Sequence, residues 1–343
     1  MDEPEQSDES ALRSAVLDAV ARAYGLDPCA PRVFKGEFDR NIRITDPEQG
    51  TWLIKVSDEQ TPAVALDWQE TVLDAAARRN ELGFHLAGHS ASAIATPRLR
   101  ATRSGQRRIT LEHGGTTFRI RVVEWIDGDL LSTRSAVPRS VYVQLGRTSA
   151  ALTRAFADLT PPADLPEHTW LAQRSTREIR AALTRLPAGE RTRTVAEVVA
   201  RFERDHADRL ARVPWGVVHQ DLHDDNTIVT GGDDSPEMRL IGVIDFNDAH
   251  RAPLVADPAI AAAYATLRAD DPRDRIAAVV AGYEQIRALS DDERALVEPL
   301  ALLRLCTNWS VWSVRAAEAH DPEYALHRSQ HTWAAVDALL GRH

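Results

Sequence analysis

The segment from Trp215 to Asp248 constrains the fold of this 343-residue chain most strongly, because it places two β-rich stretches around one polar loop. The first stretch, WGVVH, runs into the loop QDLHDDN, and the second ends in the apolar run LIGVID. The residues GGDD between the stretches are typical of a hairpin turn. Helical spacing on both sides predicts a short hairpin within a mainly helical region, and such hairpins often carry chemistry at their ends.

The polar loop has the spacing His-x-Asp-x4-Asn, formed by His219, Asp221 and Asn226, and Asp245 follows at the end of the second stretch. Phosphoryl transfer from a nucleotide needs one carboxylate to orient and deprotonate a hydroxyl group, and oxygen ligands to hold Mg²⁺ on the phosphates. We therefore predict that Asp221 is the catalytic carboxylate and that Asn226 and Asp245 bind the metal. His219 is expected to be a core residue that holds the loop rather than a catalytic group.

Two other interpretations of this loop stay open. His223, Asp224 and Asp225 are expected to be solvated loop residues or partners of hydrogen bonds within the loop. Alternatively, His219 and His223 with Asp221 could bind a transition metal for hydrolysis, but the chain lacks the further distant histidine cluster that a catalytic zinc site requires.

The rest of the chain predicts an α+β protein with two lobes. Five short strand-like stretches and one alanine-rich helix, at about 65–82, lie between residues 28 and 125, and a helix at 11–26 precedes them. After residue 125 helical spacing dominates. We expect a disordered tail at 1–8, a small β-rich nucleotide-binding lobe at 9–125, and a larger helical lobe at 126–343 with the catalytic loop, the metal site and the acceptor site.

Lysine is the rarest basic residue of the chain, since it occurs only at positions 35 and 55 while the total of Lys and Arg is 41. Lys55 ends the strand-like stretch TWLIK, where a compact ammonium would reach nucleotide phosphates that a planar guanidinium would not fit. The alternative is a lysine on the solvent side of an edge strand. Its expected carboxylate partner is Glu70, although the apolar register of the helix favours Gln69.

Two further segments of the first lobe are candidate nucleotide contacts. Lys35 lies in VFKGEF, where a loop would cover the phosphates, but Gly36 is the only glycine there, so a backbone cradle is weakly indicated. The stretch at 122–128 would join the lobes, and the backbone groups of Glu124 and Ile126 would contact the purine edge. A plain strand-to-helix connection is the alternative for that stretch.

The net charge of −10 argues against nucleic acid as a partner. Two cysteines are too few for a disulfide framework, the N-terminal sequence MDEPEQSDES is acidic, and no apolar run approaches the length of a membrane span. We therefore expect a cytoplasmic protein without a membrane partner, and the sequence does not indicate an oligomeric state.

Over about residues 28–340 the chain resembles the aminoglycoside phosphotransferase and choline kinase superfamily. The resemblance rests on EFDRNIRI, TWLIKVS, VVHQDLHDDN, GVIDFNDAHRAPLVADPAIAAAYA and LLRLCTNWSVW, and it is closest to 5-hydroxylysine kinases and to the kinase-like domains fused to class III aminotransferases. It implies a bilobal, protein-kinase-like fold, Mg²⁺ as cofactor and ATP or GTP as phosphoryl donor. By the same resemblance Asp221 is the base, Asn226 and Asp245 are metal ligands, and Lys55 contacts phosphate.

The chain departs from the superfamily pattern at Gln220 and Asn247, where glycine is common, and Asp257 is expected to cap the next helix. The leading hypothesis is a small-molecule kinase that phosphorylates a hydroxyl group. An antibiotic phosphotransferase and a non-catalytic nucleotide-binding pseudokinase are the alternatives, and the complete set of motif residues argues against the second.

The acceptor is expected to be a small hydroxylated amine or a cationic amino acid. Asp248 directly follows the metal strand, and Trp309 and Trp312 lie in a C-terminal helix, so an ammonium could meet a carboxylate and an indole face together. The alternative for the two tryptophans is helix packing. Arg251 or Arg304 would receive a substrate carboxylate, or would form structural ion pairs.

Overall fold

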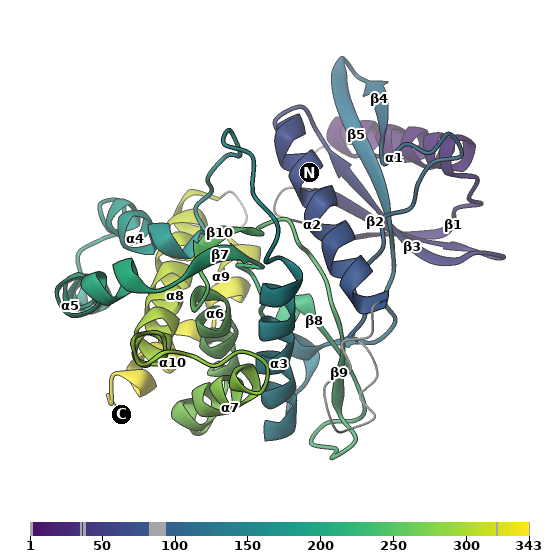
Figure 1. Ribbon diagram of the computed structural model, residues 1–343. Helices are drawn as coiled ribbons and strands as arrows, with labels where there is room; N and C mark the ends of the chain where they lie inside the picture. The colour runs from purple at the N-terminus through teal and green to yellow at the C-terminus, as the bar shows by residue number, and fades with distance from the viewer. Residues whose placement is uncertain (1–2, 35, 37–38, 82–93, 320–321, 343) are drawn as a thin grey trace. The chain divides into compact units, whose positions relative to one another are not determined.

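The computed structural model describes residues 3–34, 36, 39–81, 94–319 and 322–342 (Figure 1). The described residues of Met1–Glu81 and Ala95–Asp127 form one compact unit, here called the sheet unit. Those of Leu82–Ile94 and Gly128–His343 form a second one, here called the helical unit. The predicted α+β class, with strands gathered in the N-terminal part and helices in the C-terminal part, is confirmed. No described helix combines the length and hydropathy that a membrane span requires.

A five-stranded antiparallel sheet in the order β1-β2-β3-β5-β4 forms the centre of the sheet unit. The elements of this unit are α1 (Glu3–Tyr24), β1 (Cys29–Phe34), β2 (Arg40–Asp46), β3 (Gly50–Ser57), α2 (Ala63–Glu81), β4 (Ile109–His113) and β5 (Thr116–Glu124). Alternation along the strands gives the sheet an apolar face, on which Ile44, Ile54 and Ile120 pack with Val16 and Val20 of α1. The charged residues Lys55 and Arg121 are cross-strand partners in the register of β3 and β5.

The N-terminal helix begins earlier than the sequence indicates. A disordered tail was expected at 1–8, but α1 already starts at Glu3, and only residues 1 and 2 of that tail lie outside the described residues. Pro4 does not oppose this start, because the first N–H groups of a helix have no acceptor within the helix. The helix therefore extends by several residues beyond the stretch with clear apolar spacing.

The helical unit contains most of the chain and two small sheets, with the strand orders β10-β7 and β6-β8-β9. Its elements as far as β9 are β6 (Asp129–Leu130), η1 (Leu131–Thr133), α3 (Arg139–Ala155), η2 (Ala172–Arg174), α4 (Ser175–Leu183), α5 (Glu190–Arg212), β7 (Trp215–Val218), η3 (Asp224–Asn226), β8 (Thr227–Thr230) and β9 (Arg239–Val243). The remaining elements are β10 (His250–Pro253), α6 (Ala256–Ala265), α7 (Pro272–Glu284), α8 (Asp291–Glu318), α9 (Glu323–Ser329) and α10 (Thr332–Leu339).

The helix α6 is the centre of the helical unit. All ten of its residues are buried, and it lies against α3, α7 and α8 (Figure 1). The sequence ADPAIAAAYA suits this place, because alanine has the highest helix propensity and its small side chain lets helices pack closely on every side. The loop with Asp221 connects β7 to β8, which belong to different sheets, so its two ends are held independently.

Two glycines bring α3 and α7 into direct backbone contact. A Cβ atom on Gly146 of α3 would lie 1.9 Å from the carbonyl oxygen of Val279 in α7, and one on Gly282 of α7 would lie 1.9 Å from the carbonyl oxygen of Val143. Both distances are far below van der Waals contact, so any larger residue at either position would push the helices apart. The spacing of α3 and α7 is therefore set by the backbone itself.

Candidate active site

The loop between β7 and β8 turns sharply at Gln220, which has a φ of 68° in the left-handed region. Glycine adopts this conformation without strain, whereas a residue with a Cβ needs compensating contacts. The Gln220 backbone N–H donates to Asp257 Oδ1 at 2.9 Å, and its side-chain Oε1 accepts the N–H of Ala172 at 3.0 Å. These contacts explain how glutamine takes a position where the related superfamily commonly has glycine.

Asp257 supports the loop from within the core. It does not cap α6 as expected, because Val255 is the N-cap residue and the Asp257 carboxylate is directed at the loop instead. Asp257 is fully buried and also accepts a hydrogen bond from Ser149 Oγ at 3.3 Å. Burial raises its pKa to about 7. The loop between β7 and β8 is therefore held against α6 by one buried carboxyl group.

This carboxyl group predicts a pH dependence of stability. The pKa is 3.8 in the unfolded chain and about 7 in the fold, so between these values the folded protein keeps a proton that the unfolded chain releases. The contribution of Asp257 to the free energy of unfolding should therefore fall as the pH rises from 4 to 7, by at most about 1.4 kcal/mol per pH unit. Urea unfolding of the wild type and of Asp257→Asn across this range measures it.

The difference in the free energy of unfolding between the wild type and Asp257→Asn isolates the effect of the Asp257 carboxyl group. His219, which is fully buried with its pKa lowered to about 4 by that burial, contributes a slope of opposite sign, and it is present in both proteins. Asp274→Asn, at an exposed ion pair with Arg139, serves as the control for loss of an ordinary carboxylate. A stability difference between wild type and Asp257→Asn that stays constant from pH 4 to 7 would contradict the prediction.

Asp221 lies at the centre of a hydrogen-bonded cluster. Its Oδ1 accepts from Arg304 Nη2 at 2.8 Å, and its Oδ2 lies 2.8 Å from Asn226 Nδ2 and 3.1 Å from His223 Nε2. The loss of water around Asp221 would raise its pKa, but the charges of His223 and Arg304 outweigh this, so the pKa lies below the ordinary range. The carboxylate is thus held ionised and in one orientation.

Arg304 is the part of this cluster that the loop sequence does not reveal. It lies in α8, its side chain is 3% exposed, and its Nη1 donates to the carbonyl oxygen of Trp170 at 2.8 Å. Arg304 therefore forms a structural ion pair with Asp221, which is one of the two roles expected for it. The signal in the sequence is a single arginine within the apolar run LALLRLC, because a charge on the buried face of a helix requires a partner. Arg251, the other candidate, lies 5.4 Å from the ring of Trp215.

The strand register brings Asn226 and Asp245 together, although they are nineteen residues apart. Thr227 pairs with Val243, and the N–H of Ile244 donates to the carbonyl oxygen of Asn226 at 3.0 Å. Asn226 uses its amide nitrogen for Asp221, so its Oδ1 remains as a ligand atom, and Asp245 adopts a φ of 59° directly after the strand. Amide and carboxylate oxygens are the donor set that Mg²⁺ prefers, so the two residues fit the predicted metal site.

The neighbouring acidic residues form ion pairs. Asp224 pairs with Arg268 at 3.0 Å, and Asp225 pairs with Arg328. With His223 they are close enough to surround a cation, but an arginine already neutralises each carboxylate. His223 Nδ1 accepts the N–H of Asp225 at 3.0 Å, which is pairing within the loop as expected. The arginine partners of Asp224 and Asp225 lie outside the loop, after α6 and in α9, and the sequence did not indicate them.

In the sheet unit the structure corrects the expected partner of Lys55. Lys55 Nζ lies 3.4 Å from Asp39 Oδ2, and Ser57 Oγ donates to Asp39 Oδ1 at 2.6 Å. Glu70 is 2% exposed and pairs with Arg108 at 2.8 Å, so it is not the partner of Lys55. The reason is tertiary, because the chain before β2 places Asp39 beside Lys55, and no helical spacing of α2 could reveal this.

Arg121 and Gln69 complete this part of the sheet unit. Arg121 Nη1 donates to Gln69 Oε1 at 2.7 Å, and its Nη2 lies 3.3 Å from Asp39 Oδ2. Gln69 therefore contacts an arginine and not Lys55. Lys55, Arg121 and Asp39 are all less than one tenth exposed, so the predicted phosphate lysine belongs to a buried charge cluster. Lys35 lies outside the described residues.

The two predicted purine contacts at the end of β5, Glu124 and Ile126, differ in the backbone groups that they can offer. The N–H of Glu124 donates to the carbonyl oxygen of Arg98 at 2.9 Å, so Glu124 could offer only its own carbonyl group. The N–H of Ile126 has no partner among the residues that the structure describes. It stays a candidate donor to a purine.

The three predicted acceptor residues differ in their surroundings. Trp309 packs on Trp333 with ring centroids 5.3 Å apart, and Trp312 packs on Trp170 at 5.7 Å. Both indoles are buried, and Arg315 already stacks on Trp312 at 4.6 Å, so helix packing explains them better than an ammonium cage. Asp248 is 14% exposed and lies 4.0 Å from His168, and it remains the candidate for an ammonium ligand.

The β7–loop–β8–β9 arrangement places one oriented carboxylate, Asp221, beside Asn226 and Asp245, as expected of a kinase-like phosphotransferase. The sequence model of the phosphotransferase enzyme family matches residues 32–296. The chain belongs to this family, which also includes the aminoglycoside phosphotransferases, and it is a phosphotransferase with a hydroxyl group as acceptor.

Individual relatives agree with this assignment. The chain is 21% identical to hydroxylysine kinase of Danio rerio over 305 residues, which cover 88% of this chain and 83% of the relative. It is 38% identical to homoserine kinase of Phenylobacterium zucineum over 110 residues, 31% of this chain and 32% of the relative. The structure of a microcompartment-associated aminopropanol kinase has a TM-score of 0.64 at 16% identity, covering 95% of this chain and 96% of that one. An amicoumacin kinase has a TM-score of 0.67 at 14% identity, covering 98% and 96%.

Proposed function

We propose that this protein is a kinase that transfers the γ-phosphoryl group of ATP or GTP to a hydroxyl group of a small, amine-bearing metabolite, in the cytoplasm. The observation that carries the proposal is the cluster around Asp221, in which Arg304, His223 and Asn226 hold one carboxylate while Asp245 is brought beside Asn226. This arrangement supplies an oriented acceptor for a hydroxyl proton next to a set of cation ligands.

Asp221 would accept a hydrogen bond from the attacking hydroxyl group and align its oxygen with the phosphorus atom. Because phosphoryl transfer has a loose transition state, alignment contributes more than base strength. This suits a carboxylate whose pKa lies below the ordinary range through the charges around it. The rigid contacts of Asp221 with Arg304 and Asn226 would keep it in the aligned position between turnovers.

Asn226 Oδ1 and the Asp245 carboxylate would hold a divalent cation, for which we propose Mg²⁺. When bound, such a cation neutralises charge on the phosphates of the donor. In the sheet unit, Lys55 would contribute an ammonium to nucleotide phosphates, with Asp39 fixing its position. Ile126 would donate its backbone N–H to the purine.

An amine on the acceptor is supported by Asp248, whose carboxylate follows the metal-binding strand, and by the names of the relatives. Hydroxylysine and homoserine each carry an amino group and a hydroxyl group. Solved structures of related fold also include antibiotic kinases, so an antibiotic acceptor is tested in the same assay.

Nucleotide consumption with Mg²⁺ and either ATP or GTP, measured across a panel of acceptors, tests the proposal. The panel contains 5-hydroxylysine, 5-hydroxynorleucine as its match without the side-chain ammonium, homoserine, choline, neutral sugars and aminoglycosides. We expect kcat/KM for 5-hydroxylysine to exceed that for 5-hydroxynorleucine by about tenfold, the effect of one charge-assisted contact. A preference for neutral sugars would contradict the amine-bearing acceptor, and the absence of turnover with every compound would contradict the kinase.

A further inference from the structure

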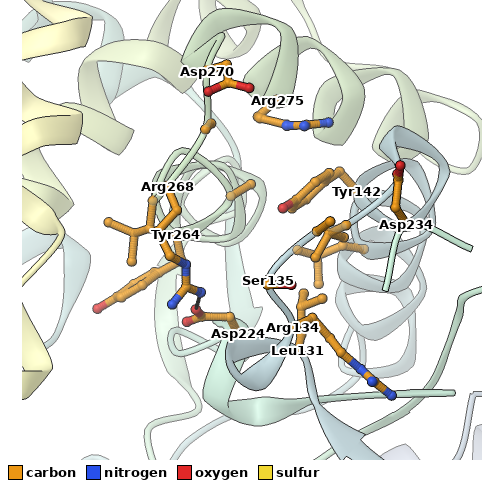
Figure 2. Close-up of a pocket in the computed structure, with 16 residues that line it drawn as sticks. Leu131, Arg134, Ser135, Tyr142, Asp224, Asp234, Tyr264, Arg268, Asp270 and Arg275 are labelled. Atoms are coloured by element: carbon orange, nitrogen blue, oxygen red, sulfur yellow. Dashed lines mark hydrogen bonds and ion pairs between the residues drawn. The ribbon is translucent and has the colours of Figure 1, made fainter. Parts of the chain in front are cut away.

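A cavity of about 260 Å³ lies entirely within the helical unit (Figure 2). It is bounded by the segment after η1, the start of α3, the end of α6 and the start of α7, and Asp224 of the catalytic loop contributes to its wall. This volume is close to the lower end of the range for small-molecule sites in proteins, about 300 Å³. Neither the family assignment nor the proposed phosphoryl transfer uses this cavity.

Six charged side chains line the cavity, and three of them are already neutralised. Arg134 pairs with Asp129 at 2.6 Å, and in Figure 2 its guanidinium is directed away from the cavity. Arg268 pairs with Asp224 at 3.0 Å across the wall, as the dashed line in Figure 2 shows. These three residues would therefore shape the cavity without offering it a net charge.

The other three charged side chains are Arg275, Asp234 and Asp270, and none has an ion pair with any residue in the described part of the chain. Arg275 instead stacks on the ring of Tyr142 at 4.8 Å, and the Tyr142 hydroxyl is directed toward the interior of the cavity (Figure 2). The cavity thus offers one guanidinium, two carboxylates and a hydroxyl group. Arg275 is half-buried, whereas Asp234 and Asp270 are exposed and accessible to a ligand. A half-buried guanidinium without an ion pair gains from a carboxylate that neutralises it.

Arg268 links the wall of the cavity to the loop between β7 and β8 through its ion pair with Asp224. Arg268 has a φ of 63° just beyond the end of α6, a place where glycine is favoured and a residue with a Cβ is strained. The side chain connects the cavity to the catalytic loop in short steps. Asp224 Oδ1 lies 3.8 Å from His223 Nδ1, and His223 Nε2 lies 3.1 Å from Asp221. Two residues, Asp224 and His223, would therefore lie between a ligand in the cavity and the Asp221 carboxylate.

We propose that this cavity binds a small basic amino acid, with its carboxylate on Arg275 and its two ammonium groups on Asp234 and Asp270. The ligand is defined by charge: one guanidinium and two carboxylates are neutralised together by a compound with one carboxylate and two ammonium groups. Such a compound could be part of the acceptor itself or a separate effector, and binding in the cavity is the same in both cases.

Calorimetric titration of the nucleotide-free protein tests the site with three hydroxyl-free probes, which cannot be phosphorylated. L-lysine has all three charged groups, L-norleucine lacks the side-chain ammonium, and cadaverine lacks the carboxylate. We expect L-lysine to bind at least about tenfold more tightly than either, which corresponds to one lost charge-assisted contact. Equal affinities for the three probes, or no binding of L-lysine, would overturn the proposal.

Variants place the binding in the cavity. Arg275→Gln and Asp270→Asn should each weaken L-lysine binding by about tenfold, and Arg275→Lys should retain most of it. Arg139→Gln, which removes an ion pair between α3 and α7 outside the cavity, is the matched control and should bind normally. Thermal midpoints verify that each variant folds. Unchanged affinity in both Arg275→Gln and Asp270→Asn would show that the site is elsewhere.

Kinetics then distinguish the two sources of the ligand. If L-lysine competes with the acceptor substrate, the cavity binds the charged part of that acceptor. This outcome rests on the proposed function. L-lysine that changes kcat without competing identifies an effector site. Since binding is measured without turnover, failure of the cavity proposal and failure of the kinase proposal give different results.

Discussion

Replacing Asp221 with asparagine is expected to lower kcat by about 10³-fold and to leave nucleotide affinity unchanged. The amide keeps the shape of the side chain, but it can neither accept the hydroxyl proton nor balance the charge of Arg304, which lies 2.8 Å away. Asp245→Ala should have the opposite signature, because it removes a cation ligand and with it the Mg²⁺-dependent part of nucleotide binding. Steady-state kinetics and nucleotide titrations with and without Mg²⁺ separate the two effects.

Asp221→Asn leaves the buried guanidinium of Arg304 with fewer partners, so the stability of this variant needs a separate control. Arg304 keeps its hydrogen bond to the carbonyl oxygen of Trp170, and a thermal midpoint close to that of the wild type would show that the loop is intact. Asp274→Asn provides a carboxylate loss on the surface of the same unit. An equal loss of nucleotide affinity in Asp221→Asn and Asp245→Ala would contradict the assignment of base and ligand.

Replacing Lys55 with arginine is expected to be nearly as harmful as replacing it with alanine, with kcat/KM falling by about 10²-fold or more in both. Lys55 is 9% exposed and lies beside Arg121 and Asp39, so a second planar guanidinium has little room to form the same contacts. Kinetics of both variants with saturating acceptor provide the measurement. Retention of most activity by Lys55→Arg would show that charge alone suffices at this position.

A second pair of variants distinguishes Asp39, the partner of Lys55 that the structure shows, from Glu70, the partner that the sequence favours. Asp39→Asn should raise KM for the nucleotide because it loosens Lys55, whereas Glu70→Gln should change it little, since Glu70 is bound to Arg108. The two variants each remove one buried carboxylate charge from the same unit, so each is a control for the other. A larger effect of Glu70→Gln would restore the helix residue as the functional partner.

The residues that could be predicted are those whose placement is local or follows from strand pairing. Asp221 and Asn226 lie in one loop, and Asp245 follows β9, which pairs with β8 directly before it in the sequence. Apolar alternation likewise predicts β2 to β5, since each inward residue meets a neighbour of the same kind. It does not predict β1, which runs over Cys29–Phe34, is almost entirely exposed, and overlaps the expected stretch VFKGEF only at its start. These signals are carried by contiguous sequence.

The residues that could not be predicted meet their partners only in the folded chain. Arg304 and Asp221 are 83 residues apart, and Asp39 reaches Lys55 from a segment with no regular pattern. Trp309 and Trp312 show the reverse difficulty, because an aromatic pair at helical spacing suits both a ligand site and a packed core. Trp170 and Trp333, which are distant in sequence, contribute to their burial.

The backbone contact of α3 with α7 has a consequence for how related chains would diverge. Tyr142 lies on α3 and Arg275 on α7, and the glycines at 146 and 282 set the distance between these two helices. A descendant with alanine at either glycine would have to separate the helices by about 1 Å or more, and Tyr142 from Arg275 with them. Ligand preference could therefore change during evolution through two residues that never touch the ligand, while every side chain that lines the cavity stays the same.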